Sequence, residues 1–147
     1  MNNRHFWAQK ICAAITAAEG GPSEYDLAEA PVLNYWRPHI TRHGAPILWG
    51  MVSKHPMVEK GWITTSQLVA IDANRRWART ASRWHVLAQP FSVYEARVAK
   101  DFGMDEAPSG FVRVDLPGYR PLDDLLLLDE LLAIWRDRMA FELKGED

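Results

Sequence analysis

The sequence predicts an α+β fold, in which a small antiparallel β-meander or partly open barrel packs with an amino-terminal helix and a long carboxy-terminal helix. Residues 45–90 contain short apolar and β-branched runs that are separated by turn signals, as expected for a meander. Residues 4–18 and 121–143 carry apolar side chains at helical spacing. With 147 residues, the chain fits a single domain (1–147) that can bury an ordinary core.

The amino-terminal helix is predicted from an apolar stripe that comprises Phe6, Ile11, Ala14, Ile15 and Ala18. Gly20-Gly21-Pro22 ends the helix, because glycine frees the backbone and proline cannot continue it. Ser23 is expected to cap a short helical turn, with Asp26 at the third position after it. Residues 32–36 are read as a second turn or as an extended arm that lies across the sheet, anchored by Leu33 and Trp36.

The meander is predicted to contain three runs. The first, residues 47–52, is apolar on both faces and ends at Lys54-His55-Pro56. The second, residues 62–71, is rich in β-branched residues and is closed by an Asx-type turn at Asp72-Ala73-Asn74. The third, residues 76–87, is either continuous or folded on itself at Ala81-Ser82.

Two helices and a short strand are expected after the meander. Residues 90–102 form the first helix, with Ser92 and Glu95 as a capping box, and residues 111–116 form the strand. Pro121 is expected in the first turn of the final helix, where Asp123 and Asp124 complement the helix dipole.

The final helix contains four consecutive leucines, Leu125 to Leu128, so both of its sides should touch apolar surface. Either the helix is buried between the sheet and the first helix, or one side docks on a second copy of the chain as a homodimer.

Composition excludes several classes of protein. Hydrophobic residues make up 48% and charged residues 24%, a globular balance. The net charge of −2 gives no bulk field that would attract nucleic acid or an anionic membrane. A single cysteine, Cys12, fits a reducing compartment, and no apolar run is long enough to span a membrane. We therefore expect a soluble, cytoplasmic protein with no membrane partner.

The best candidate binding residues form an arginine run interleaved with aromatic side chains: Arg75, Arg76, Trp77, Arg79, Arg83 and His85. No acid lies between Asn74 and His85, whereas the segment from Asp123 onward holds eight acids and three bases. If the third run is one continuous strand, its residues 77, 79, 83 and 85 share a face. A solvated face with internal cation–π contacts, an acidic protein partner and a single-stranded nucleic acid all remain open.

Other motifs give weaker signals. His39 and His43 are four apart, as zinc ligands on a helix often are, but the neighbouring prolines and Gly44 disfavour a helix and no third ligand is near. Cys12 is read as a buried structural thiol, and Ser66 has no local histidine partner. No glycine-rich phosphate loop is present, so we predict no cofactor, no metal and no catalytic residue.

An ordered string of short motifs resembles a domain-of-unknown-function family of small bacterial proteins. Its parts are G-x-V-x-x-H-P at residues 50–56, I-x-T-S at 63–66, and W-A-R-T-x-S-R-W at 77–84, preceded by A-P-x-L-x-x-W at 30–36. Residues 87–89 read Leu-Ala-Gln where the family pattern has Leu-Gly, so the turn there differs. The resemblance implies the meander and carries no activity.

The leading functional hypothesis is a non-catalytic binding protein that acts through the arginine–tryptophan face. Small stand-alone proteins of this kind resemble accessory proteins of phages and mobile elements, which is an association only. A nucleic-acid-binding small barrel is the alternative, and an uncharacterised enzyme is the third hypothesis.

Overall fold

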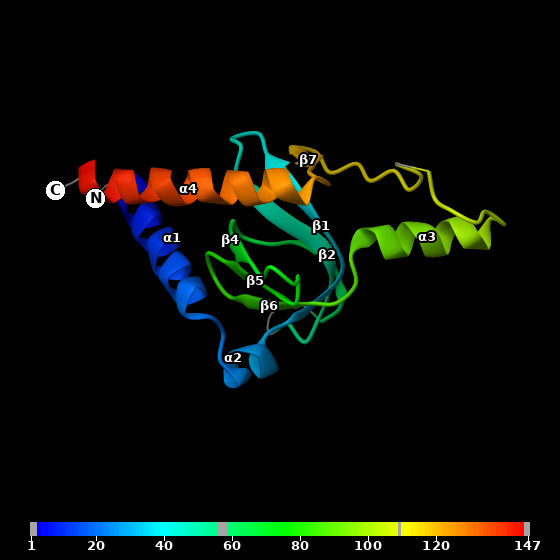
Figure 1. Ribbon diagram of the computed structural model, residues 1–147, viewed down its shortest axis with the longest axis horizontal. Coiled ribbons are helices and arrows are strands. Elements are labelled where there is room, and N and C mark those ends of the chain that lie inside the picture. The colour runs from blue at the N-terminus through cyan, green and yellow to red at the C-terminus, as the bar shows by residue number, and fades with distance from the viewer. Residues whose placement is uncertain (1–2, 56–58, 109, 146–147) are drawn as a thin grey trace.

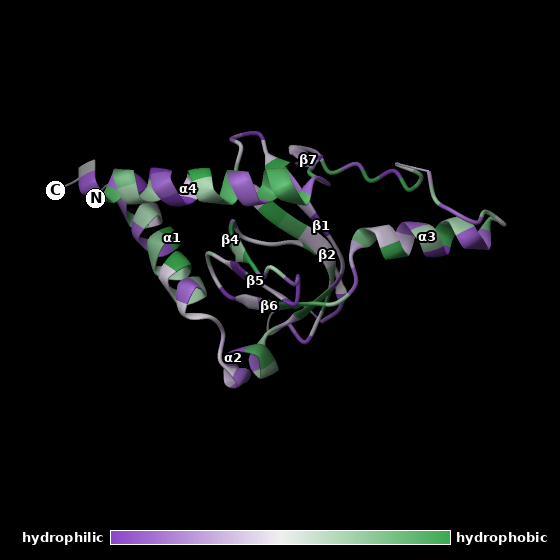
Figure 2. Ribbon diagram, in the orientation of Figure 1, coloured by the Kyte–Doolittle hydropathy of each residue, from purple (hydrophilic) through white to green (hydrophobic). Residues whose placement is uncertain are grey.

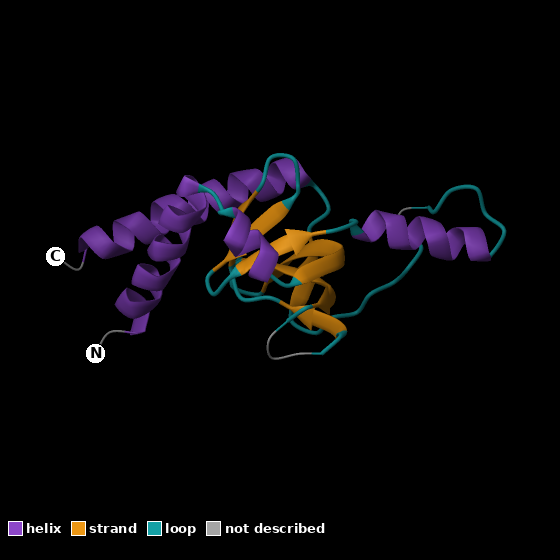
Figure 3. Cartoon of the chain, turned by 90° about the horizontal axis from the view of Figure 1, so that it is seen from below, coloured by secondary structure: helices purple, strands orange, loops and turns teal. Residues whose placement is uncertain are grey.

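A curled, seven-stranded sheet forms the centre of the protein in the computed structural model, which describes residues 3–55, 59–108 and 110–145 (Figure 1). Helices α1 and α4 lie on one side of this sheet, and α3 projects from the opposite side (Figure 3). The elements in order are α1 (Asn3–Gly20), α2 (Glu24–Glu29), β1 (Val32–Thr41), β2 (Pro46–Ser53), β3 (Gly61–Thr64), β4 (Leu68–Ile71), β5 (Trp77–Thr80), β6 (Trp84–Leu87), α3 (Phe91–Asp101), β7 (Tyr119–Pro121) and α4 (Leu125–Gly145). The predicted α+β class is confirmed.

The strands follow the order β3-β2-β1-β6-β5-β4, and β7 pairs with β1 outside this path. All pairings are antiparallel except that of β1 with β6, which is parallel. The end strands β3 and β4 follow each other in the chain and are not paired, so the sheet is not closed into a barrel. The strands of the predicted meander are therefore present as two antiparallel groups, β2–β3 and β4–β5–β6, and β1 lies between these groups in one curled, open sheet.

Residues 32–36 are extended, which is one of the two expectations, but they begin the central strand β1 instead of forming a turn or an arm that lies across the sheet. The register of β1 against β2 shifts between Asn34 and Arg37, and Tyr35 between them has a positive φ of 53°. This bulge places both Tyr35 and Trp36 in buried positions, so the usual alternation of a strand is lost from the sequence. Leu33 and Trp36 are buried, as expected for anchors.

The second run of the meander divides into two strands, and the third run folds into a hairpin. Residues 62–71 do not form one strand, because residues 65–67, which connect β3 to β4 along the chain, belong to neither strand. There the Thr65 hydroxyl accepts a hydrogen bond from the Leu48 amide at 3.0 Å. Residues 76–87 fold at Ala81-Ser82 into the hairpin of β5 and β6, one of the two predicted forms.

The capping prediction at Ser23 is confirmed. The Ser23 hydroxyl accepts from the Asp26 amide at 3.0 Å, and the Asp26 carboxylate accepts from the Ser23 amide at 2.9 Å. The capping box at Ser92 is wrong: Pro90 precedes α3 as its cap, and the Glu95 carboxylate accepts from the Val112 amide instead.

Two boundaries near the carboxyl end are also corrected. Residues 111–116 form no strand, and Pro121 lies in β7 rather than in the final helix. Helix α4 begins at Leu125, and Asp124 caps it by accepting hydrogen bonds from the amides of Leu126 and Leu127.

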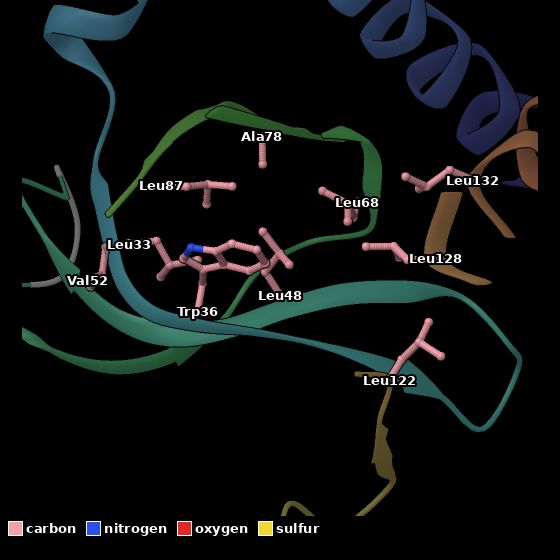
Figure 4. Packing of buried hydrophobic residues seen from close by; sticks show 10 residues of the cluster. All are labelled: Leu33, Trp36, Leu48, Val52, Leu68, Ala78, Leu87, Leu122, Leu128 and Leu132. Carbon is pink, nitrogen blue, oxygen red and sulfur yellow. The ribbon is translucent and has the colours of Figure 1, made fainter. Parts of the chain in front are cut away.

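The core lies inside the curl of the sheet and beneath the start of α4. Figure 4 shows the side chains that fill it: Leu33, Trp36, Leu48, Val52, Leu68, Ala78, Leu87, Leu122, Leu128 and Leu132. A second cluster joins α1 to α4 through Ile11, Ile15 and Met139. The two long helices therefore cover one opening of the sheet.

Apolar residues are spread around α4 rather than confined to one stripe (Figure 2). Leu128 is fully buried, whereas Leu126 is 75% exposed and Ile134 is 61% exposed. Of the helices in the described ranges, none is long and apolar enough to cross a membrane.

Candidate functional site

The hairpin of β5 and β6 divides the predicted binding residues between two faces of the sheet. Arg79 pairs with Trp84 and Ala78 pairs with His85, because only residues 81 and 82 connect the paired ends at 80 and 83. A connection of two residues reverses the parity of the second strand, so His85 points into the core with Ala78. A common face for His85 and Arg79 is expected only for a continuous run. Because the run folds at Ala81-Ser82, Trp84 shares the face of Arg79 instead.

The outer face of the hairpin is an aromatic pair capped by a guanidinium. The Trp77 and Trp84 rings meet edge to face, with centroids 5.3 Å apart, and the Arg79 guanidinium carbon lies 5.2 Å from the Trp84 ring centre. The Arg79 Nε atom donates to the Thr80 carbonyl oxygen at 3.0 Å. Arg79 is thus held in place by contacts within the protein.

Two of the four arginines are paired with carboxylates. The Arg75 guanidinium donates to both Asp129 oxygens on α4, at 3.3 and 3.4 Å. The Arg76 Nε atom donates to Asp72 at 2.9 Å. Burial raises the pKa of Asp72, but the hydrogen bonds from Arg76 together hold that pKa below its usual value. The arginine run is therefore not one continuous basic patch.

Arg79, Arg83 and Trp84 line a groove of about 330 Å³ between α2 and the β5–β6 hairpin. We call it the α2–β6 groove, and its lining residues are Tyr25, Asp26, Glu29, Ala30, Pro31, Arg79, Ser82, Arg83 and Trp84. Burial lowers the pKa of Arg79, and the charge of Asp26 acts against this effect. The groove thus offers two arginines on one wall and two acids on the other.

Arg83 also lines a second hollow of about 140 Å³. Its walls come from β3, β5 and β6 and from the segments that follow β2 and β3. We call it the polar cavity, and it is lined by His55, Ile63, Thr64, Thr65, Ser66, Thr80, Ser82, Arg83 and His85. Eight of these nine side chains are polar, and no described acid lines the hollow. Sequence reasoning missed this site, since it read His55 as a turn residue and Ser66 as a residue of the second run without a local histidine partner.

Two polar atoms at the polar cavity are buried without a hydrogen-bond partner in the described part of the chain, namely Ser66 Oγ and His85 Nδ1. His85 is only 2% exposed. Burial, followed by the charges of Arg83, His55 and Arg79 in that order, lowers the pKa of its imidazole to about 4. His85 is consequently neutral near pH 7, and it lines the cavity together with the cationic Arg83.

A third hollow, of about 600 Å³, lies between β1, the start of α3 and the segment before α4. Trp36 and Phe91 form apolar parts of its wall, and the polar side chains of Arg37 and Asp123 on the wall are hydrogen-bonded to each other. Because Arg37 and Asp123 satisfy each other, the hollow presents no orphaned charge from this pair.

The two histidines considered as metal ligands do not share a helix. His39 is buried in β1, with its Nδ1 atom 3.2 Å from the Arg37 carbonyl oxygen, and His43 is exposed in the turn after β1. Burial lowers the pKa of His39. Across residues 3–55, 59–108 and 110–145, no three His, Cys, Asp or Glu side chains are placed to hold a metal ion. Cys12 is half-buried on α1, and burial raises the pKa of its thiol.

Contact of α4 with a second copy stays a prediction. Its exposed apolar side chains are Leu126, Leu127, Ile134 and Phe141, and the structure contains one chain.

Comparison with known proteins adds a family and no function. No curated protein and no solved structure matches the chain. One family model matches residues 2–145, which confirms the resemblance to a domain-of-unknown-function family. The chain belongs to DUF6634, a family of unknown function.

Proposed function

We propose that the protein is a non-catalytic binding protein that holds an acidic segment of a protein partner in the α2–β6 groove. The observation that carries this proposal is that Arg83, unlike Arg75 and Arg76, has no carboxylate partner among the described residues. Arg75 and Arg76 each have a carboxylate partner. No described residue accepts a hydrogen bond or an ion pair from the half-buried Arg83 guanidinium.

An unpaired, partly desolvated guanidinium is well suited to a carboxylate, which it can bind through two parallel hydrogen bonds. Trp84 lies beside Arg83 in the groove and Tyr25 stands at its rim with 74% of its surface exposed. Aromatic residues next to arginine are typical anchors of protein interfaces. Asp26 and Glu29 on the opposite wall would select a partner segment that also carries a basic residue.

Single-stranded nucleic acid is a weaker candidate for the same groove. Base stacking needs an open ring face, but Arg79 covers Trp84 and the edge of one indole meets the other. A phosphate backbone also offers no cation to pair with Asp26 and Glu29, whereas a protein segment can carry a basic residue there.

An enzyme remains the third hypothesis, since the polar cavity brings Ser66 and His85 to one hollow. A histidine that activates a serine usually needs a third group to orient it, and no described carboxylate lines this cavity.

The test is capture of partners from lysate, with and without nuclease, followed by titration of the captured partner's acidic fragments against the purified protein. Wild type is compared with Arg79→Ala/Arg83→Ala, and the matched control is Arg76→Ala, which removes an arginine of the same strand region outside the groove. We expect a nuclease-resistant partner whose affinity falls roughly tenfold or more in the double variant and is unchanged in the control. Equal binding by both variants, or recovery that nuclease abolishes, would contradict the proposal.

A further inference from the structure

The polar cavity, which Arg83 lines, contains buried polar atoms without a hydrogen-bond partner among the described residues. His85 is 2% exposed and its Nδ1 atom has no partner in the described ranges, although buried polar atoms are nearly always paired. The buried Ser66 Oγ atom, which lines the same cavity, is likewise without a partner. Two orphaned groups on one cavity indicate that something absent from the single chain satisfies them.

The charges around the cavity identify the class of ligand. Arg83 borders it, and the half-buried His55 lies on the same wall. No aspartate or glutamate is among the described lining residues, so no described carboxylate balances the guanidinium within this cavity. Hydroxyl groups of Thr64, Ser66 and Ser82 supply further donors. A cavity with one fixed cation, donors and no acid favours an anion and disfavours a metal ion.

The size of the cavity limits that anion. A volume of about 140 Å³ holds a small oxyanion or a few water molecules, and it is too small for a nucleotide or a cofactor. Exposed Ser82 and half-buried Arg83 form its outer wall, so an ion can reach it from solvent.

We infer that the polar cavity binds a small tetrahedral oxyanion, either free phosphate or the phosphoryl group of a phosphate monoester, between Arg83, Ser66 and His85. Arg83 supplies the charge, the Ser66 hydroxyl donates a hydrogen bond, and the imidazole of His85 donates from its protonated nitrogen. The inference shares Arg83 with the proposed function, but it does not require a protein partner, because the cavity and the groove are lined by different residues apart from Ser82 and Arg83.

The experiment is calorimetric titration of the full chain with inorganic phosphate and, separately, with O-phosphoserine, at constant ionic strength with chloride as the reference salt. We expect saturable binding to wild type that weakens roughly tenfold or more in Arg83→Gln, because a charge-assisted hydrogen bond is lost. Ser66→Ala should weaken it as well, and Arg76→Gln should leave it unchanged. Binding of phosphate alone would identify the free ion as ligand, and equal binding of both would identify a phosphoryl group.

A second measurement uses wild type alone, so its outcome does not depend on whether the variants fold. Nuclear magnetic resonance of the His85 imidazole in wild type should show its pKa rising above its depressed value of about 4 when phosphate is added, since an anion offsets the charge of Arg83. No saturable heat with either ligand, or no response of His85, would overturn the inference and leave water as the occupant.

The two proposals fail separately. Ser66→Ala removes a residue of the cavity alone, and Arg79→Ala removes a residue of the groove alone. Loss of phosphate binding with partner binding intact in Ser66→Ala, and the reverse in Arg79→Ala, would support both. Identical effects of the two variants would show that one of the sites is misassigned.

Discussion

Arg37 in β1 donates two hydrogen bonds to the carboxylate of Asp123, the residue two positions before α4. Nε donates to Oδ1 at 2.9 Å, and Nη2 donates to Oδ2 at 2.8 Å. The Arg37 side chain is 10% exposed and also lies 5.0 Å from the Phe91 ring centre. The pair ties the central strand to the start of the final helix, although 86 residues separate the two partners. Asp123, which the sequence suggested as a helix-dipole residue, therefore acts mainly as a partner for a buried cation.

Asp123→Asn should destabilise the protein by roughly 1–3 kcal/mol, because it leaves a buried guanidinium with weakened pairing. Urea denaturation followed by tryptophan fluorescence measures the change. The matched control is Asp129→Asn, which removes the longer and more exposed pair with Arg75 and should cost less than about 1 kcal/mol. Equal effects of the two substitutions would show that the geometry of the Arg37 pair adds nothing.

The same pair predicts a loss of stability in acid. The hydrogen bond from Arg37 holds the pKa of Asp123 below its usual value, so the contribution is complete above the unfolded pKa of about 4. It should disappear as the pH falls through the lower folded pKa. In Asp123→Asn, unfolding free energy should depend less on pH below about pH 4 than in wild type.

His85 predicts a second loss of stability at a higher pH. Burial and the nearby Arg83 lower its folded pKa to about 4, whereas the unfolded imidazole titrates near its ordinary value of 6.5. The unfolded state therefore binds the proton first, and stability should fall by about 2 kcal/mol between pH 7 and pH 5. Comparison of this slope with that of His85→Asn isolates the residue from His39, which contributes in the same direction.

Local signals in the sequence account for the parts of the fold that were predicted correctly. The Ser23–Asp26 capping box, the glycine–proline stop after α1 and the fold at Ala81-Ser82 depend on neighbours within a few residues. The central strand was missed because its bulge at Tyr35 removes the alternation that marks a strand. That bulge depends on pairing with β2 and on contacts of Tyr35 with Trp62 and Tyr94, all of which lie elsewhere in the chain.

The candidate site divides in the same way. The arginine run was visible because it is contiguous, but its pairing was not, since Asp129 lies on α4 more than fifty residues from Arg75. The polar cavity was invisible for the converse reason. His55, Ser66 and His85 come from three separate segments, and only the curl of the sheet brings them together.

Gly50 tests the close approach of β1 and β2. A Cβ atom at this position would lie 2.9 Å from the Asn34 carbonyl oxygen and 3.0 Å from Leu33 Cγ. The carbonyl belongs to the bulged region of β1 and cannot move without changing the register, so Gly50→Ala should cost about 1–3 kcal/mol. Gly61→Ala in β3 is the matched control, because no atom lies within 4 Å of its added Cβ. If Gly50→Ala leaves the free energy of unfolding unchanged, the backbone of β1 can shift to accept the added Cβ atom at little cost.

The four leucines at the start of α4 allow core burial and association to be separated. Leu128 is fully buried, so Leu128→Ala should cost about 2–5 kcal/mol at any protein concentration. Leu126 is 75% exposed, and in a monomer Leu126→Ala should change stability by less than about 0.5 kcal/mol. If α4 docks on a second copy, the stability of wild type should rise with protein concentration and Leu126→Ala should abolish that rise. Urea midpoints at two concentrations a hundredfold apart, with sedimentation of both variants, distinguish the two cases because only association depends on concentration.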